Sequence, residues 1–295
     1  MTPQKNTFNG ILNVYKEQGY TSHDVVAKLR GILKQKKIGH TGTLDPEAEG
    51  VLPVCLGKAT KLCDLLAGHD KVYEAVMLLG QSTDTQDTTG TVLESATVTA
   101  SEEEVREAVL SFEGPYEQIP PMYSALKVNG QKLCDLARKG RQVERQPRSV
   151  TIHELTLLSR EGDTLRLRVR CSKGTYIRTL CADIGEALGC GGCMQALRRT
   201  QAGEYTIAEA VPLQQLLEAA EPETYLRDVD TMFRGYPGVK LTVNQEKRCR
   251  NGNAFSVSLP GGTYRAYSQT GEFLMLAKVE DGVMSTIKSF FDPIS

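Results

Sequence analysis

The decisive stretch of this sequence is Gly39-His40-Thr41-Gly42-Thr43-Leu44-Asp45-Pro46, followed by Glu47-Ala48-Glu49-Gly50-Val51-Leu52-Pro53-Val54. A helix cannot continue through it, because Pro46 lacks an N–H group and pushes Asp45 into an extended conformation. The glycines open backbone angles that are closed to other residues, or let a ligand come close. A carboxylate on such a stiff polar loop can act as a nucleophile or a base. On spacing alone, the simpler interpretation is an Asp-Pro turn whose side chain caps its own backbone.

Length and composition bound the class of protein. The 295 residues leave room for one large domain and a small one, or for two medium ones, and a hydrophobic share of 40% is typical of globular proteins. No run of 18 or more apolar residues is present, and residues 1–9 are polar, so we expect neither a membrane span nor a secretory signal. The expected location is the cytoplasm.

The eight cysteines are scattered, which fits a reducing compartment better than a disulfide framework. Only Cys190 and Cys193 have the spacing of a metal or redox motif. A zinc site needs a second pair, and a thioredoxin-like site needs a strand that leads into the motif. We therefore expect no metal.

The net charge of −1 hides a strong asymmetry along the chain. Residues 72–122 carry one basic and ten acidic side chains, whereas residues 123–200 carry 15 basic and seven acidic ones, a net charge of +8. A polyanion would be held by the basic segment, because contacts to phosphates dominate such binding. A solvent-exposed surface with an uneven charge distribution and no polyanion partner would give the same sequence pattern.

Hydrophobic periodicity and capping signals predict mixed secondary structure. The expected strands are residues 10–15, 71–76, 91–98, 151–158 and 165–171. The expected helices are residues 23–33, one that ends near 68, one that begins at 101, and residues 133–138, 180–188 and 211–217. From about residue 237, short strands with glycine turns at 239–243, 254–259, 263–267 and 273–279 indicate a small barrel. A generic β appendix is the alternative.

Several motifs occur together in one order along most of the chain. They are His40-Thr41-Gly42-Thr43-Leu44-Asp45-Pro46, Lys58-Ala59-Thr60-Lys61, Pro120-Pro121-Met122-Tyr123-Ser124-Ala125-Leu126-Lys127, Lys173-Gly174-Thr175-Tyr176-Ile177-Arg178 and Leu197-Arg198-Arg199-Thr200. This set resembles the bacterial tRNA pseudouridine-55 synthases, the TruB family. The opening strand and the turn at Lys16 resemble that family too, although the proline usual after this lysine is Glu17 here.

The resemblance implies an α+β pseudouridine synthase fold with a mixed, mostly antiparallel sheet, followed by a small C-terminal PUA-like β-barrel. The corresponding division places a catalytic domain with RNA-binding insertions at residues 1–235. A PUA-like RNA-binding domain then occupies residues 236–295.

The resemblance also implies roles for particular residues. Asp45 is the catalytic aspartate, Arg178 pairs with its carboxylate, and Tyr73 stacks on the target base and could deprotonate C5. The residues implied in binding substrate or RNA are His40, Tyr176, Leu197, Lys16, Lys58, Lys61 and Lys127. Without the resemblance, simpler interpretations apply to three of these residues. Tyr73 would pack against neighbouring strands, Arg178 would be a cation on the surface, and Leu197 would belong to the hydrophobic core.

The implied reaction converts uridine 55 in the T-arm of tRNA to pseudouridine on a base flipped out of the stack. The implied enzyme is a monomer that needs no cofactor, metal or protein partner. Whether Asp45 attacks the sugar or the base, or removes a ribose proton, stays open. Three alternatives also stay open: an RNA-binding protein or tRNA folding chaperone with a vestigial pocket, an aspartate-dependent hydrolase of small substrates, and a paralogue that modifies another uridine.

Overall fold

The computed structural model describes residues 8–291, and its larger part is built on a ten-stranded sheet. The main path is β14-β1-β3-β12-β4-β11-β10-β7, with β2 paired to β3 and β13 to β12. The strands are β1 (Gly10–Lys16), β2 (Ile38–His40), β3 (Glu49–Leu56), β4 (Lys71–Leu79), β7 (Gly114–Gln118), β10 (Arg148–Glu161), β11 (Thr164–Cys171), β12 (Gly192–Ala202), β13 (Tyr205–Thr206) and β14 (Val211–Pro212). Only the pairs β1–β14 and β12–β3 of this sheet are parallel within the described chain. The predicted mixed, mostly antiparallel sheet is confirmed.

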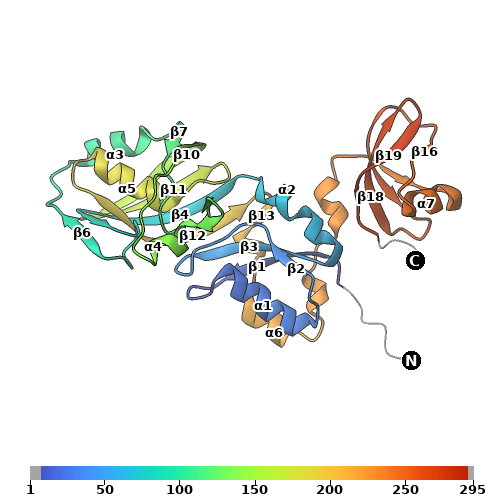
Figure 1. The fold of residues 1–295 in the computed structure, drawn as a ribbon, viewed down its shortest axis with the longest axis horizontal. Helices are drawn as coiled ribbons and strands as arrows, with labels where there is room; N and C mark the ends of the chain where they lie inside the picture. The colour runs from blue at the N-terminus through green and yellow to red at the C-terminus, as the bar shows by residue number, and fades with distance from the viewer. Residues whose placement is uncertain (1–7, 292–295) are drawn as a thin grey trace.

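Two groups of helices cover this sheet (Figure 1). Helices α1 (Ser22–Leu33) and α6 (Leu213–Glu218) pack on β1 and β3, where Leu29 and Leu216 share a core with Leu12. Helices α3 (Glu102–Leu110) and α5 (Ile177–Ala187) pack on β4, β10 and β11. The start of α1 follows from its sequence, because Thr21 and the third helical residue form a capping box.

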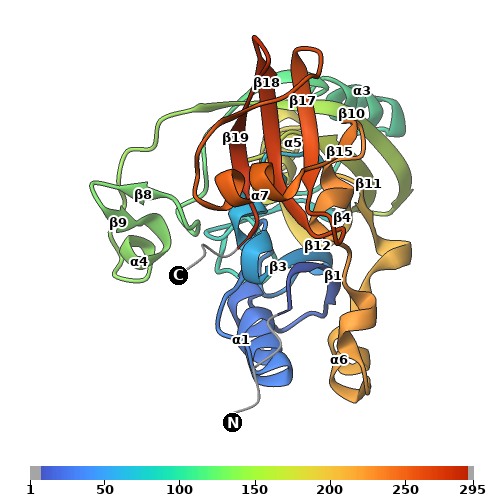
Figure 2. The same cartoon turned by 90° about the vertical axis from the view of Figure 1, so that its right-hand side faces the viewer.

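Two small hairpins extend from the sheet. One consists of β5 (Gln81–Thr83) and β6 (Val92–Ser95). The other consists of β8 (Lys127–Val128) and β9 (Gln131–Lys132), and it leads into helix α4 (Leu133–Ala137). Figure 2 shows that β8, β9 and α4 project sideways from the body of the protein. Most of the cations in the basic segment 123–148 therefore lie on a protruding arm.

The C-terminal part is a separate five-stranded sheet in the order β15-β17-β18-β19-β16. Its elements are β15 (Gly238–Lys240), α7 (Val243–Arg250), β16 (Phe255–Ser256), β17 (Gly262–Tyr267), β18 (Phe273–Glu280) and β19 (Val283–Ser289). The sheet curls around a core of its own that includes Leu241, Phe255 and Leu274, which agrees with the predicted PUA-like barrel.

Five short helical segments lie between strands. Three of them join strands of the large sheet: η1 (Gly57–Leu62) and α2 (Cys63–Ala67) lie between β3 and β4, and η2 (Ile207–Glu209) lies between β13 and β14. The other two, η3 (Pro222–Tyr225) and η4 (Val229–Phe233), lead from α6 to β15 of the C-terminal sheet. One apolar cluster runs through the junction, because Phe233 and Phe290 are buried together with Ile11 and Val51 of the large sheet. The domain division at 235/236 stays a prediction; it falls between η4 and β15.

Two sequence predictions assign part of a segment to the wrong kind of element. Residues 239–243 were expected to be one strand, but β15 ends at Lys240 because Thr242 forms a capping box with Gln245 and starts α7. Residues 211–217 were expected to be a helix, but Val211 and Pro212 first pair with β1 as a strand. The strand β19 was not expected. Within residues 8–291, no helix is long and apolar enough to cross a membrane.

Candidate active site

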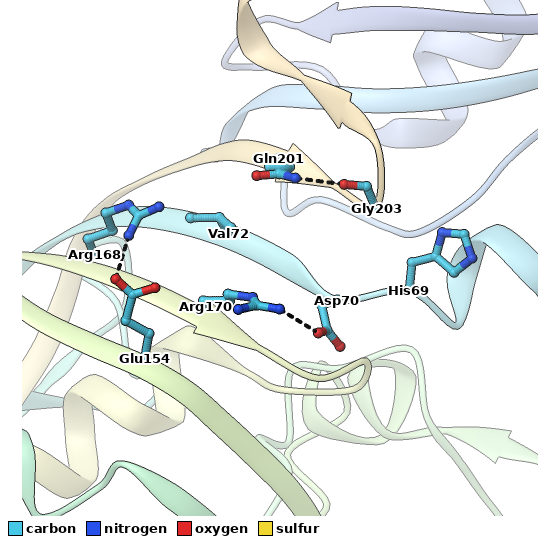
Figure 3. Close-up of a pocket in the computed structure, with 8 residues that line it drawn as sticks. All are labelled: His69, Asp70, Val72, Glu154, Arg168, Arg170, Gln201 and Gly203. Atoms are coloured by element: carbon cyan, nitrogen blue, oxygen red, sulfur yellow. Dashed lines mark hydrogen bonds and ion pairs between the residues drawn. The ribbon is translucent and has the colours of Figure 1, made fainter.

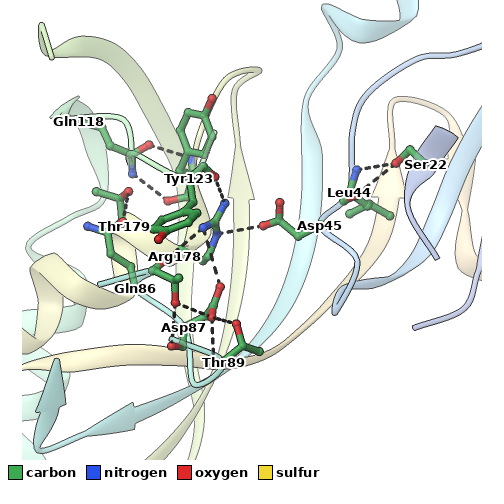
Figure 4. A network of polar contacts seen from close by, with 12 residues as sticks. Ser22, Leu44, Asp45, Gln86, Asp87, Thr89, Gln118, Tyr123, Arg178 and Thr179 are labelled. Carbon is green, nitrogen blue, oxygen red and sulfur yellow. Dashed lines mark hydrogen bonds and ion pairs between the residues drawn. The ribbon is translucent and has the colours of Figure 1, made fainter. Parts of the chain in front are cut away.

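The loop that carries Asp45 links β2 to β3 and is fixed by its own backbone. The amide of Thr41 donates to the carbonyl of Pro53 at 3.1 Å, and the amide of Ala48 donates to that of Asp45 at 3.1 Å. The Ser22 hydroxyl, at the start of α1, accepts from the Leu44 amide at 2.9 Å. The Asp-Pro turn expected from the sequence is therefore real, but its amides are satisfied by other groups, and the Asp45 side chain points away from the loop (Figure 4).

Two buried cations hold the same loop from beneath. Lys16 is fully buried, and its ammonium donates to the carbonyls of Tyr20 at 2.6 Å and of Pro46 at 3.2 Å. Arg199 is 1% exposed, and its guanidinium donates to Val51 at 2.7 Å and to Gly42 at 3.3 Å, on either side of Asp45. Lys16 was expected among the residues that bind RNA; the structure places its ammonium in the interior, where it supports the loop.

The carboxylate of Asp45 faces the guanidinium of Arg178 across the site (Figure 4). Asp45 Oδ2 lies 2.9 Å from Arg178 Nε, and the two side chains differ sharply in exposure, 39% for Asp45 and 6% for Arg178. Arg178 sits in the first turn of α5. A charged hydrogen bond at this distance fixes the orientation of the carboxylate. The pair therefore presents an accessible anion held by a buried cation.

Arg178 is itself anchored on its far side. Its guanidinium donates to the carbonyl of Tyr123 at 2.9 Å and to that of Thr85 at 3.1 Å, and Asp87 Oδ2 lies 3.8 Å from Nη1. Asp87 in turn accepts from the hydroxyl of Thr85 at 2.8 Å and from the amide of Thr89 at 3.0 Å. The guanidinium therefore lies between two carboxylates in a fixed orientation.

The predicted aromatic and apolar walls come from three elements next to this pair. Tyr73 on β4 is 8% exposed and shares a core cluster with Leu44, Ile177 and Leu197, the last of which lies on β12. Tyr176 immediately precedes α5 and is half-buried; its backbone exchanges two hydrogen bonds with the side-chain amide of Gln118. The fold thus brings Asp45, Arg178, Tyr73, Tyr176 and Leu197 to one region of the sheet.

Burial controls the protonation of the neighbouring groups. Burial raises the pKa of the Tyr73 phenol, and the charge of Arg199 and a hydrogen bond from it oppose this rise. Burial, with the charges of His23 and Arg199, lowers the pKa of His40, so its imidazole is neutral at pH 7. His40 Nδ1 is buried and has no hydrogen-bond partner among residues 8–291. A neutral imidazole with an unused nitrogen can still bind a polar ligand group.

The remaining predicted lysines lie elsewhere. Lys58 and Lys61 are on η1 at the junction with the C-terminal sheet: Lys58 Nζ lies 3.7 Å from Glu272, and Lys61 donates to the Ser289 carbonyl at 2.8 Å. Lys127 is exposed on β8, in the protruding arm. The structure thus separates these three cations from the Asp45–Arg178 pair in the fold.

Sequence reasoning missed two of the groups that build the site. The sequence predicts no role for Asp87 or for the second arginine of the Leu197-Arg198-Arg199-Thr200 block. In the structure Asp87 makes an Asx-turn contact with the amide of Thr89, and it also faces Arg178. The only sequence signal for Arg199 was its place beside Leu197 in a recognised motif.

A cleft of about 610 Å³ lies away from this site (Figure 3). It is lined by His69, Asp70, Val72, Glu154, Arg168, Arg170, Gln201 and Gly203. Because strand residues alternate between faces, Val72 opens on the face of β4 opposite to Tyr73. Arg168 and Arg170 pair there with Glu154 and Asp70. Within residues 8–291, no group of three or more His, Cys, Asp or Glu side chains could hold a metal ion.

Comparisons with known proteins agree with this geometry. Residues 30–177 match the TruB family pseudouridylate synthase N-terminal domain, and residues 178–229 match the tRNA pseudouridylate synthase B C-terminal domain. The chain is 57% identical to tRNA pseudouridine synthase B of Lachnoclostridium phytofermentans over 83% of each chain. It is 44% identical to the Clostridium acetobutylicum protein of the same name, over 95% of this chain and 99% of that one.

A solved structure gives the same fold. The crystal structure of a Cbf5-Nop10-Gar1 complex contains a chain that superposes with a TM-score of 0.70 at 26% identity, over 96% of this chain and 85% of that one. The predicted pseudouridine synthase fold is therefore confirmed. From the two domain matches and the identity to these relatives over most of its length, this chain belongs to the TruB family of pseudouridylate synthases.

Proposed function

We propose that the protein isomerises uridine 55 in the T-arm of tRNA to pseudouridine, and that Asp45 starts the reaction. Membership of the TruB family and the name tRNA pseudouridine synthase B carried by its relatives support tRNA pseudouridylation. The observation that carries the proposal is the Asp45–Arg178 pair, because it presents an accessible carboxylate 2.9 Å from a buried, anchored guanidinium. The predicted location in the cytoplasm and the monomeric state remain predictions.

The reaction takes a base out of folded RNA. Flipping a nucleotide costs a few kcal/mol, and stacking in a pocket of aromatic and apolar walls offsets that cost. In our proposal Tyr73 and Tyr176 stack on the uracil, and Leu197 closes the apolar side. His40, neutral and with Nδ1 unused, forms a hydrogen bond to the flipped nucleotide.

The chemistry is an isomerisation, so atoms are conserved. The N1–C1′ bond breaks, the uracil rotates, and C5 bonds to C1′; C5 then loses a proton and N1 gains one. Asp45 starts this sequence by attack on the sugar or the base, or by removal of a ribose proton. Arg178 holds the carboxylate of Asp45 in a fixed orientation, and Tyr73 accepts the proton that leaves C5.

Recognition of the tRNA rests on charge outside the pocket. Residues 123–148, which include the β8–β9–α4 arm, carry exposed cations. These are Lys127, Lys132, Arg138, Lys139, Arg141 and Arg148. We propose that this arm binds the phosphates of the T-arm, so that affinity falls steeply with salt. In this proposal the C-terminal sheet forms a second RNA-binding unit, with the boundary near 235/236.

The test is carbodiimide-based mapping of pseudouridine in an unmodified tRNA transcript. Wild-type protein should produce one new signal, at uridine 55, and Asp45→Ala should produce none while it still binds the transcript. The matched control is Glu47→Ala, which removes an exposed carboxylate two residues away and should modify as the wild type does.

Two outcomes would overturn the proposal. Signal at another uridine would replace the proposed target, and the same signal from Asp45→Ala would remove the proposed catalytic role. No signal from wild type, with binding intact, would leave an RNA-binding or chaperone activity as the better explanation.

A further inference from the structure

Arg199 is unusual because it is a buried charge without a carboxylate partner. Its side chain is 1% exposed, and no carboxylate in residues 8–291 lies within ion-pair distance of it. Its guanidinium donates hydrogen bonds to the carbonyl oxygens of Val51 and Gly42. Burying an uncompensated guanidinium is costly. The adjacent Arg198, by contrast, is half-exposed and pairs with Glu49 at 2.6 Å.

Arg199 lies between Asp45 and Tyr73, the two side chains that react in the proposed mechanism. Its carbonyl partners, Gly42 and Val51, flank Asp45 in the loop. On the sheet, Arg199 of β12 is the cross-strand partner of Tyr73 of β4, so both side chains lie on one face. The guanidinium thus lies between the Asp45 loop and Tyr73, and its positive charge acts on the Tyr73 phenol.

We propose that Arg199 is a positioning residue with two linked tasks: it clamps the Asp45 loop, and its charge makes the Tyr73 oxygen able to accept the proton from C5. This inference rests on the proposed function. In the step concerned, the C5–H bond breaks, its electron pair restores the C5–C6 double bond, and the proton moves to the phenolate oxygen of Tyr73. The phenol returns this proton to water before the next turnover.

The electrostatic surroundings of Tyr73 support this assignment. The groups that face it are Arg199 on β12, Cys171 on β11 and Asp45 on the loop; the last two and burial disfavour the phenolate. Arg199 alone among them favours it. The charges of Lys16 and Lys71 interact with that of Arg199 and add to the positive potential around it.

The experiment compares Arg199→Met with Arg198→Met, which removes the neighbouring charge on the opposite face of the same strand. Single-turnover conversion is measured on a tRNA transcript whose uridines carry hydrogen or deuterium at C5, between pH 6 and 9.5. For Arg199→Met we expect a rate loss on the order of 10- to 100-fold at pH 7, which is less than the roughly 10²- to 10⁴-fold contribution of a general base because Tyr73 itself remains. We also expect a larger deuterium isotope effect than in wild type, and a rate that levels off at a higher pH. Arg198→Met should match wild type in all three.

A purely structural role would give a different pattern. If Arg199→Met slows the reaction with no change in isotope effect or pH profile, Arg199 holds the loop only, and the link to Tyr73 is wrong. If Arg199→Met does not fold, the comparison moves to Arg199→Lys with and without Tyr73→Phe. Arg199→Lys should lower the single-turnover rate when Tyr73 is present. In the Tyr73→Phe protein the same substitution should lower the rate by no more than about twofold. Equal losses of rate in both backgrounds would overturn the inference. Absence of any pseudouridine with wild type would instead refute the proposed function.

Discussion

Replacing Lys16 with methionine should change how stability depends on pH. Lys16 is fully buried, and its ammonium donates to three carbonyls, one of them that of Pro46, which follows Asp45 in the loop. Burial lowers the pKa of Lys16 from 10.5 to about 8, although the charges of Asp45 and Glu47 oppose that change. The charged form is therefore tolerated in the fold at a cost.

The sign and size follow from proton linkage. Unfolded Lys16 keeps its proton up to about pH 10.5, whereas folded Lys16 releases it near pH 8. Between these values unfolding takes up a proton, so the contribution of Lys16 to stability rises with pH. At about 1.4 kcal/mol for each unit of pKa, the free energy of unfolding of wild type relative to Lys16→Met should rise by about 3 kcal/mol from pH 7 to pH 10.5.

Urea unfolding of both proteins at several pH values measures this difference. Subtracting the two curves cancels the buried thiols and phenols that titrate in the same range, because they are common to both proteins. Lys36→Met, at an exposed position, is the control and should differ from wild type by a constant amount. A flat or falling difference between wild type and Lys16→Met would refute the assignment of a buried, destabilised ammonium.

Three further changes test other parts of the structure. Arg178→Met leaves Asp45 without its counter-ion and two carbonyls without their donor, so we expect a loss of about 3 kcal/mol and a Tm lower by about 6–12 °C in a thermal scan. Gly50→Ala places a methyl group 2.2 Å from the Arg199 carbonyl oxygen at φ +109°, which should cost at least about 2 kcal/mol in urea unfolding; an unchanged midpoint would contradict this. Phe290→Ala opens the junction cluster and should cost about 3–5 kcal/mol, with early release of the C-terminal sheet seen by limited proteolysis.

Local signals in the sequence predicted most of the elements. The capping boxes at Thr21 and Ser101 begin helices where expected. The alternation of residues 165–171 gives β11, with its arginines on the face opposite to the core. These features succeed because capping and alternation depend on residues only a few positions apart.

The failures have equally local causes. The central strand β12 was not predicted, because register shifts at Met194/Ala196 and Arg199/Gln201 break its alternation. Helix α7 was missed although Thr242 and Gln245 form the same capping box that marked other helices. Its mean hydropathy is low, so the sequence has no apolar stripe at helical spacing that would predict a helix there.

Only those site residues that lie in recognised motifs could be predicted from the sequence. The residues that form the walls came from blocks with a family resemblance, and the fold does bring them together. The anchoring of Arg178 by Asp87, and the clamp that Arg199 places on a loop about 150 residues earlier, depend on strand order and register. Sequence spacing gives no measure of such contacts.

The apolar cluster at the junction has a consequence for both parts of the chain. Phe233, Phe273 and Phe290 pack against one another with ring centroids 5.3–6.0 Å apart, and their cluster includes Ile11 of β1 and Val51 of β3. Phe233 of η4 is therefore part of a core that both sheets share. A substitution in this cluster should affect both sheets at once, so the RNA contacts that we propose for the two parts of the chain depend on the same three aromatic rings.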